Sequence, residues 1–384
     1  MKRTLIYLVI TLCCSSVFAA SVEQADSVVT ARKPNLLQRV VGYAVGNEID
    51  TSTVNALRPK LMALGGPYYS TDAKLGMVLA GMLSFRMKGS DPRSQASNLM
   101  LFSGISTAGF WQVGISGAVL FPRDKRRINA DLLFNYSPIH FWGIGYAMAD
   151  NDSNEGHLHQ QELRCEADYV LRVAPHLYVG PALALNRVRC SHIDRPELLN
   201  GQDRLLRNYG VGFSLHYDTR DQITNATSGF YLSLRQLFRP SWLGNHYAFS
   251  TTSFSASARH SLWEGGVVAG EVRGVFNFGN PSWAMLAQLG GNDNMRGYYN
   301  GRYRDKHLMT AQVEVRQHVW KRSGLAAWVG VGTAFHDAIS FGNLLPNYGI
   351  GYRFHLRKTL VLRLDYGFGK VHQNGFVMSV NEAF

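Results

Sequence analysis

From residue 60 onward, apolar and polar residues alternate along the chain in one segment after another. The clearest case is 311–319, where apolar Ala311, Val313, Val315 and Val319 alternate with polar Gln312, Glu314, Arg316 and His318. A period of two places successive side chains on opposite faces of a β-strand. The same alternation recurs in 161–172, 347–356 and 361–366. The sequence therefore predicts strands with one apolar and one polar face.

This pattern predicts about sixteen strands, separated by turn residues. They fall near 60–67, 75–86, 98–106, 112–121, 127–136, 161–173, 177–190, 207–218, 229–238, 247–262, 266–278, 307–321, 325–335, 347–356, 360–368 and 375–384. Short and long gaps alternate, which is typical of transmembrane barrels with tight periplasmic turns and extended outer loops. An even number of strands places both ends of the barrel on the periplasmic side.

Two architectures would bury one apolar face of such strands. A soluble sandwich needs a second sheet or amphipathic helices, and it would place the charged faces at a cost in its interior. The sequence offers no such helices. A membrane barrel turns the apolar face to lipid and the polar face to the lumen, and its closure leaves no unpaired edge. We therefore predict an all-β, antiparallel transmembrane barrel over 57–384.

The first residues predict export. Lys2 and Arg3 precede an apolar run of about eight residues and a small-residue cleavage site near Ala20, as in a secretory signal peptide. We expect the signal peptide at 1–20 and a short periplasmic or plug leader at 21–56. The net charge is +12. An exported chain with scattered basic residues is expected to meet outer-membrane lipids rather than nucleic acid.

Three passages carry a family resemblance. The long gap at 279–306 contains Arg296-Gly297-Tyr298, and Asp218-Thr219-Arg220-Asp221 is followed by Gly229. The chain ends with Phe376 to Phe384, within the last predicted strand at 375–384. Together they resemble the BamA/TamA superfamily of outer-membrane barrels, also called the bacterial surface antigen family. Its arginine-glycine-aromatic signature lies in the sixth outer loop, and the Asp-x-Arg-Asp passage lies at a periplasmic turn.

The resemblance implies that the sixth outer loop folds into the lumen. Arg296 would then pair with Glu314 on the next strand, with Gly297 and Tyr298 packed close to the wall. Family members often carry a second acid one strand further on, where Gly330 stands here, so we expect a less firmly held loop. Asn381 replaces a glycine that is usual in the last strand.

The resemblance also suggests an assembly signal and a seam. Phe376, Met378, Val380 and Phe384 alternate onto one predicted face, and such an aromatic-terminated strand would be read by the barrel-assembly machinery. The closing strand would meet the first strand at Gly65, Gly66 and Pro67. These residues offer little packing, and Pro67 has no N–H to donate. We expect this lateral seam to be weak.

The function implied is outer-membrane biogenesis, or the insertion or translocation of protein or lipid. The leader is too short for a POTRA module, so a separate periplasmic capture protein would be needed. Two alternatives remain open, a structural or adhesive surface barrel and a passive porin.

Chemical sites are weakly indicated. Asp150 to Gly156 resembles the start of a calcium loop, but its glycine comes one place late. His157 and His159 share one side of an extended segment without an evident third ligand. No serine lies in a phospholipase signature, so we expect neither enzymatic activity nor a cofactor. Cys165 and Cys190 are predicted on opposite faces of the wall, which disfavours a disulfide.

Overall fold

The computed structural model describes residues 59–70, 73–90, 96–223, 225–357, 360–370 and 373–384. The expected signal peptide at 1–20 and leader at 21–56 lie outside these residues. Among the residues described, no helix is long and apolar enough to cross a membrane.

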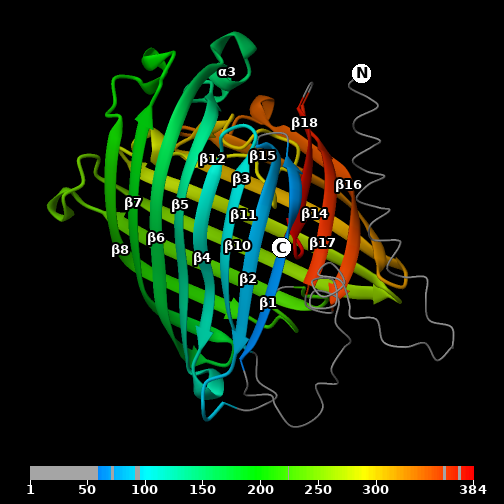
Figure 1. The fold of residues 1–384 in the computed structure, drawn as a ribbon. Helices are drawn as coiled ribbons and strands as arrows, with labels where there is room; N and C mark the ends of the chain where they lie inside the picture. Colours follow the sequence, from blue (N-terminus) through cyan, green and yellow to red (C-terminus); the bar gives the residue numbers. More distant parts are fainter. Residues whose placement is uncertain (1–58, 71–72, 91–95, 224, 358–359, 371–372) are drawn as a thin grey trace, which may run out of the picture. The chain divides into compact units, whose positions relative to one another are not determined.

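In this part of the chain, sixteen strands form one antiparallel barrel (Figure 1). They are β1 (Lys60–Ser70), β2 (Lys74–Phe85), β3 (Ser97–Ser106), β4 (Trp111–Leu120), β5 (Arg126–Phe141), β6 (Gly156–Ala174), β7 (Leu177–Ser191), β8 (Leu205–Asp218), β9 (Gly229–Arg239), β10 (Phe249–Trp263), β11 (Gly266–Gly279), β14 (His307–Trp320), β15 (Ser323–Phe335), β16 (Leu345–Arg357), β17 (Leu360–Phe368) and β18 (Asn374–Val380). Each strand pairs with its neighbours in sequence, and β1 meets β18. The predicted fold class is confirmed.

Short helical pieces occupy several of the connections. They are η1 (Pro122–Asp124), α3 (Tyr146–Ala149), η2 (Asp152–Asn154), η3 (Pro196–Leu199), η4 (Ser241–Leu243), η5 (Trp283–Met285) and η6 (Phe341–Asn343). Most of them lie in the long connections at one end of the barrel, which carries α3 at the top of Figure 1.

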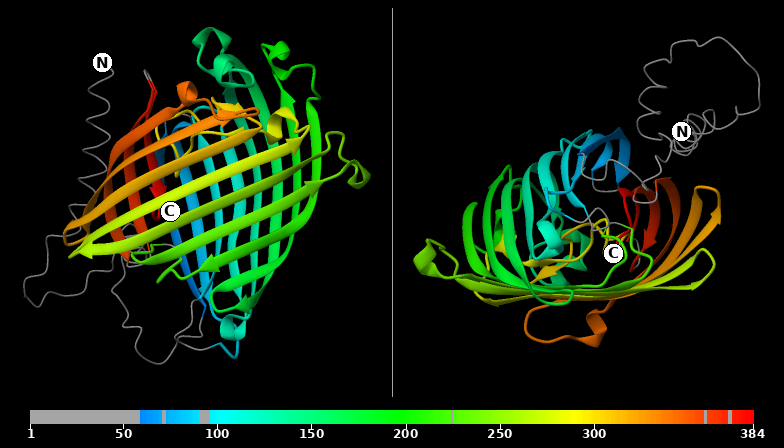
Figure 2. Two further views of the ribbon diagram at one scale, coloured as in Figure 1. Left: turned by 180° about the vertical axis from the view of Figure 1, so that it is seen from behind. Right: turned by 90° about the horizontal axis from the view of Figure 1, so that it is seen from below.

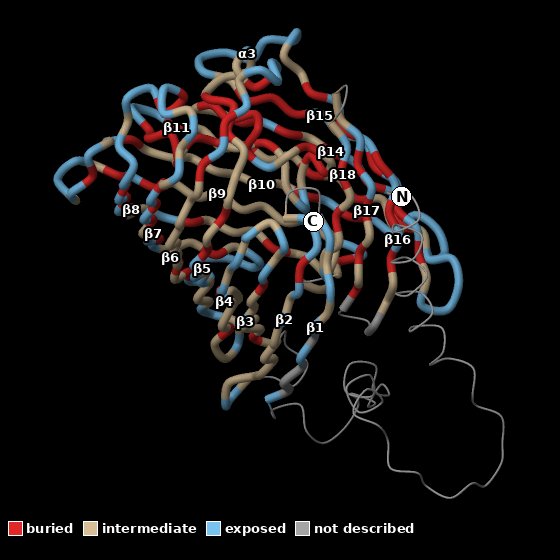
Figure 3. The backbone as a smooth tube through the Cα atoms, turned by 45° about the horizontal axis from the view of Figure 1, so that its top comes forward, coloured by how far each residue is buried: buried red, intermediate tan, exposed pale blue. Residues whose placement is uncertain are grey.

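Alternation along each strand divides the wall into two faces (Figure 3). In β14, Val313 and Val315 are exposed on the outside, whereas Gln312, Glu314 and Arg316 are buried on the inside. An exposed apolar outer face is what lipid requires, and a polar inner face needs partners within the lumen. Cys165 is exposed and Cys190 is buried, and both are free.

The largest differences from the predicted strands lie around the β5–β6 hairpin. β5 extends to Phe141 and β6 begins at Gly156, so both strands run several residues beyond the predicted ends at 136 and 161. Their paired register continues to Phe141 and Gly156. Period-two alternation weakens there because the strands have left the zone in which one face meets lipid. The continued cross-strand pairing extends them, and Phe141 and Leu158 of the extended ends are buried in an apolar cluster with Trp283.

Candidate functional site

The connection between β11 and β14 is the sixth outer loop, 280–306, and it folds back inside the ring of strands (Figure 2). Its two ends pair as a small hairpin of β12 (Ala287–Gln288) and β13 (Arg304–Asp305). Between them, the loop buries a cluster of apolar side chains against the wall: Leu289, Met295, Tyr298 and Tyr303 with Leu308, Ala334 and Leu345. The loop is therefore a packed part of the barrel interior.

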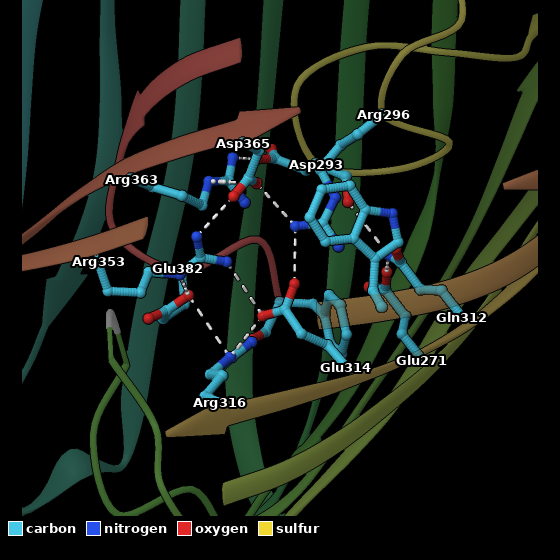
Figure 4. A network of polar contacts seen from close by, with 12 residues as sticks. Glu271, Asp293, Arg296, Gln312, Glu314, Arg316, Arg353, Arg363, Asp365 and Glu382 are labelled. Atoms are coloured by element: carbon cyan, nitrogen blue, oxygen red, sulfur yellow. Dashed lines mark hydrogen bonds and ion pairs between the residues drawn. The ribbon is translucent and has the colours of Figure 1, made fainter. Parts of the chain in front are cut away.

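Arg296 at the tip of this loop is fully buried between two acids of the wall (Figure 4). Its Nη1 lies 2.7 Å from Glu314 Oε2 and 2.8 Å from Asp365 Oδ2. The guanidinium also stacks 3.6 Å above the ring centroid of Trp328. The structure thus brings together the predicted partners Arg296 and Glu314, and it adds Asp365 from β17.

The ion pairs of Arg296 belong to a larger group of charged side chains in the lumen. Arg353 contacts Asp365 at 2.5 Å and Glu314 at 3.4 Å. Arg316 binds Glu314 at 2.6 Å. Glu382 contacts Arg353 at 2.9 Å and Arg316 at 3.4 Å. We call this set the luminal network: Arg296, Arg316, Arg353 and Arg363 with Asp293, Glu314, Asp365 and Glu382.

The luminal network sets four arginines against four acids, and the side chains of three of these acids are buried, whereas that of Asp293 is half-exposed. An isolated buried charge is costly, whereas a fully paired set retains most of the Coulomb attraction in a medium of low dielectric. Arg363 extends the set back to the loop, because its Nη2 binds Asp293 at 2.7 Å while its Nε lies 3.4 Å from Asp365. The loop is held at two charged points.

The premise that the loop arginine lacks a second acid is wrong. Gly330 lies opposite Gln312 in the β14–β15 register, and Trp328 lies opposite Glu314. The second acid is Asp365, which reaches the same arginine from β17. Because the wall is curved, inward side chains of β14 and β17 meet in the lumen. The order of the strands in the sequence does not show this contact.

Gly297 allows the loop backbone to touch β17 directly. Its φ is 101°, and a Cβ at this position would lie 2.4 Å from the carbonyl oxygen of Gly367. A Cβ on Gly367 would lie 2.0 Å from the carbonyl oxygen of Arg296. The side chain of Asn347 donates to that same Arg296 oxygen at 2.6 Å. Gly297 and Gly367 thus face each other where the loop backbone touches β17.

Tyr298 anchors the next residue of the loop. Its hydroxyl donates to the carbonyl oxygen of Pro346 at 2.6 Å and accepts from the backbone N–H of Lys370 at 2.7 Å. Both partners lie near the outer end of the wall. The phenol therefore ties the loop to the beginning of β16 and to the connection after β17.

At its outer side, the loop binds the β5–β6 connection. Arg302 lies 2.6 Å from Asp152, and the hydroxyl of Tyr303 donates to Asp150 at 3.2 Å. Asp150 also pairs with Lys370 at 2.7 Å. The carboxylates that resembled a calcium loop are thus already paired with basic side chains.

The Asp150–Lys370 pair predicts a loss of local order in acid. The hydrogen bond from Lys370 holds the pKa of Asp150 below its ordinary value of 3.8. A lowered pKa in the folded state contributes stability above the ordinary pKa, and this contribution is lost as the pH falls through the folded value. We expect the backbone amides of 146–155 to exchange hydrogen more slowly in the wild type than in Asp150→Asn at roughly pH 5 to 7. The difference should vanish near pH 2 to 3, and its persistence there would assign the protection to other contacts.

The Asp-x-Arg-Asp passage forms a compact turn after β8. Arg220 binds both carboxylate oxygens of Asp218, at 2.9 and 3.1 Å. Asp221 accepts from the hydroxyl of Thr227 at 2.7 Å. Gly229 has φ 105°, and a Cβ there would lie 2.4 Å from the carbonyl oxygen of Thr219. The four predicted residues lie together and shape the turn.

The seam between β1 and β18 is the weakest junction of the described wall. The two strands share a single paired position, Ser70 with Val377. β17 and β18 share seven, from Leu362–Val380 to Phe368–Asn374. Continued in the same register, Val380 would stand opposite Pro67. Gly65, Gly66 and Pro67 pair with β2 on their other side.

The last residues leave the wall and enter the lumen. β18 ends at Val380, and Asn381 adopts φ 67°, a left-handed conformation that asparagine tolerates better than most residues other than glycine. Arg316 then donates to the carbonyl oxygen of Phe384 at 2.9 Å. The expectation that Phe384 shares a face with Phe376, Met378 and Val380 is wrong, because the turn at Asn381 breaks the alternation.

Deleting Phe384 is expected to lower the folded, heat-modifiable fraction of the barrel in outer membranes. The deletion removes the terminal aromatic of the predicted assembly signal, and it also removes a ring that lies 5.4 Å from the Arg316 guanidinium. Phe384→Tyr should behave as the wild type because it keeps both. Equal folded levels in all three proteins, measured by gel mobility with and without heating, would contradict the signal.

The sequence contained a signal for the residues of the network that it did not single out. Arg353, Arg363 and Asp365 all occupy inward positions of alternating strands, where charges need partners. Trp328 has no such signal, because a tryptophan on the inner face is recognisable only once Arg296 is placed above it. Alternation did not indicate the direction of the Glu382 side chain, because the turn at Asn381 ends the strand before this residue.

These features define a class, an outer-membrane β-barrel with an inward-folded arginine loop. A model of the Omp85 superfamily domain matches residues 121–384. The chain belongs to the Omp85 superfamily. No curated protein sequence matches the chain.

Solved structures of similar fold include members of this superfamily. The barrel resembles BamA from Haemophilus ducreyi lacking POTRA domains 1–3, with a TM-score of 0.56, 11% identity and coverage of 84% of this chain and 70% of that one. CdiB from Escherichia coli gives a TM-score of 0.51 at 14% identity, covering 85% of this chain and 64% of that one. CdiB from Acinetobacter baumannii gives 0.50 at 9% identity, covering 84% and 59%. The chain thus spans less than two thirds of either CdiB, and at these identities the likeness concerns the fold.

Proposed function

We propose that this barrel inserts or translocates protein or lipid at the outer membrane by opening sideways at the β1–β18 seam. The observation that carries the proposal is that the described residues of β1 and β18 share one paired position, whereas β17 and β18 share seven. An open strand edge in lipid exposes unpaired backbone groups, so it is stable only when short or when another strand replaces the lost partner. A client strand would be such a replacement.

Membership of the Omp85 superfamily supports this role, as does the likeness of the fold to BamA and CdiB. A separate periplasmic protein would capture the client, and the barrel itself would catalyse no reaction. Both ends of the barrel would face the periplasm. The packed sixth loop argues against a passive porin, because it fills part of the lumen with buried side chains.

The test is a disulfide across the seam. Ser70→Cys with Val377→Cys uses the one paired position, and directly opposite residues have Cα atoms about 4.5–5.5 Å apart, within reach of a disulfide. Cys165→Ser and Cys190→Ala remove the native thiols. We expect the oxidised protein to fold but to fail to restore outer-membrane integrity in a deletion strain, and reduction should restore its activity.

The matched control places Leu364→Cys and Met378→Cys across β17 and β18, which are already paired along their length. Oxidation there should leave activity unchanged. Full activity of the seam-locked protein would exclude lateral opening and favour a structural or adhesive surface barrel.

A further inference from the structure

A cluster of histidine and carboxylate side chains lies at the outer ends of β5 and β6. His140 and His157 stand directly opposite each other in the antiparallel register, and Glu155 immediately precedes β6. Their ring centroids are 4.5 Å apart. The Nδ1 of His140 lies 2.5 Å from Glu155 Oε1, and the Nε2 of His157 lies 4.0 Å from the same oxygen.

Three ligand atoms therefore converge on one point, all within 4.8 Å of one another. A tetrahedral zinc ion with bonds of about 2.0–2.2 Å holds its ligand atoms about 3.3–3.6 Å apart. The observed separations bracket that range. All three side chains are partly exposed, so small rotations about their side-chain bonds can equalise the distances without moving the paired backbone.

Asp194, from the connection between β7 and β8, orients one of the imidazoles. Its Oδ1 accepts from the backbone N–H of His157 at 2.7 Å, and its Oδ2 lies 3.0 Å from His157 Nδ1. A carboxylate on Nδ1 places the ring proton there and directs the Nε2 lone pair towards Glu155. Metal-binding histidines usually have such a carboxylate or carbonyl behind them.

The second imidazole is held by aromatic rings. His140 stacks on Trp142 with ring centroids 5.9 Å apart and meets Tyr299 edge-on at 5.3 Å. Its backbone N–H also donates to the hydroxyl of Tyr299 at 3.0 Å. Both histidines are thus positioned by neighbours that take no part in the cluster.

We propose that His140, Glu155 and His157 form a binding site for a transition-metal ion of the zinc class, with Asp194 as its positioning residue. Two imidazoles and one carboxylate are the ligand set of borderline-soft ions, whereas calcium and magnesium require oxygen ligands. Three protein ligands leave a fourth position open to water or to a ligand from outside. The alternative is an ordinary exposed ion pair, which would not need two imidazoles on one carboxylate or a second carboxylate behind one ring.

The site differs from the pair that the sequence suggested. His157 and His159 alternate along β6, but the ring of His159 lies against Tyr136 and His192 instead. The missing ligands come from β5 and from the residue before β6. A bound ion would join the outer ends of two strands and, through Tyr299, border the sixth loop.

The test is titration of the folded, detergent-solubilised barrel with Zn²⁺ alone, using protein without a polyhistidine tag. Calorimetry should give one ion per chain. His140→Ala and His157→Ala should each weaken binding by at least about 100-fold, and Asp194→Asn by about 10- to 100-fold with unchanged stoichiometry. His192→Ala, which removes a nearby histidine outside the cluster, should leave the affinity unchanged.

Cobalt supplies a second readout that a weak surface site would not give. Co²⁺ bound to the wild type should show the intense visible absorption of a four-coordinate ion, and Zn²⁺ should displace it. Unchanged Zn²⁺ affinity in the double variant His140→Ala/His157→Ala, checked for folding by heat-modifiable gel mobility, would overturn the proposal. So would the absence of any Zn²⁺ binding by the wild type.

Discussion

Replacing Arg296 by alanine is expected to release the sixth loop from the barrel wall. The arginine is fully buried and pairs with Glu314 and Asp365 at 2.7 and 2.8 Å. Its removal leaves two carboxylates short of a cation in a confined lumen, and breaking a buried pair in this way costs about 3–5 kcal/mol. The loop residues 292–305 should become sensitive to added chymotrypsin, whose aromatic targets are unaffected by the substitution.

Replacing Glu314 is expected to loosen the loop less than replacing Arg296 does. Glu314→Ala leaves Arg296 paired with Asp365, so the loop should loosen less than in Arg296→Ala. The double change Arg296→Ala/Glu314→Ala should be little worse than Arg296→Ala, because the same pair is broken once. Strictly additive effects would show that the two residues hold the loop independently.

A matched control uses a luminal pair that does not touch the loop. Arg235 pairs with Glu166 on the opposite part of the wall. Arg235→Ala should leave 292–305 as resistant to chymotrypsin as in the wild type. Digestion of the loop in this variant would show that any lost luminal charge loosens the barrel.

Replacing Gly297 by alanine is expected to displace the loop by a different physical route. The new Cβ would stand 2.4 Å from the carbonyl oxygen of Gly367, where backbone meets backbone and neither can rotate away. Gly367→Ala creates the same clash from the wall side and should have the same effect. Both variants should show loop cleavage by chymotrypsin and a lower folded fraction on heat-modifiable gels.

The control for Gly297→Ala is Gly291→Ala in the same loop. Gly291 also has a positive φ, 120°, but a Cβ there would lie no closer than 3.9 Å to its nearest neighbour, Asn300 Oδ1. It should therefore cost only the backbone strain of about 1–3 kcal/mol. Equal loop exposure in both variants would attribute the effect to strain and not to the contact with β17.

The position of Glu382 links the loop to the seam. It follows β18 by two residues and pairs with Arg353 and Arg316, which also hold Glu314. A movement of β18 away from the wall would therefore draw an acid out of the luminal network. The network is therefore joined to the end of the closing strand through the carboxylate of Glu382 and the carbonyl oxygen of Phe384.

The sequence by itself determined the class of fold, the two faces of the wall and the identity of the loop arginine. Period-two alternation is a local property of each strand, and it is regular because one face of the strand must be apolar towards lipid. It can therefore be recognised without knowing which strands pair. Arg296 and Glu314 were singled out by the family resemblance of Arg296-Gly297-Tyr298, and alternation added only that Glu314 occupies an inward position on the strand that follows the loop.

Only the tertiary structure decided which distant residues meet. Asp365, Trp328 and Glu382 reach Arg296 or its partners because the wall is curved and the chain turns inward at Asn381. The cluster at His140 arises because hydrogen bonding between β5 and β6 continues beyond the alternating segment. Closure and register bring together positions far apart in the chain, and a single sequence records neither.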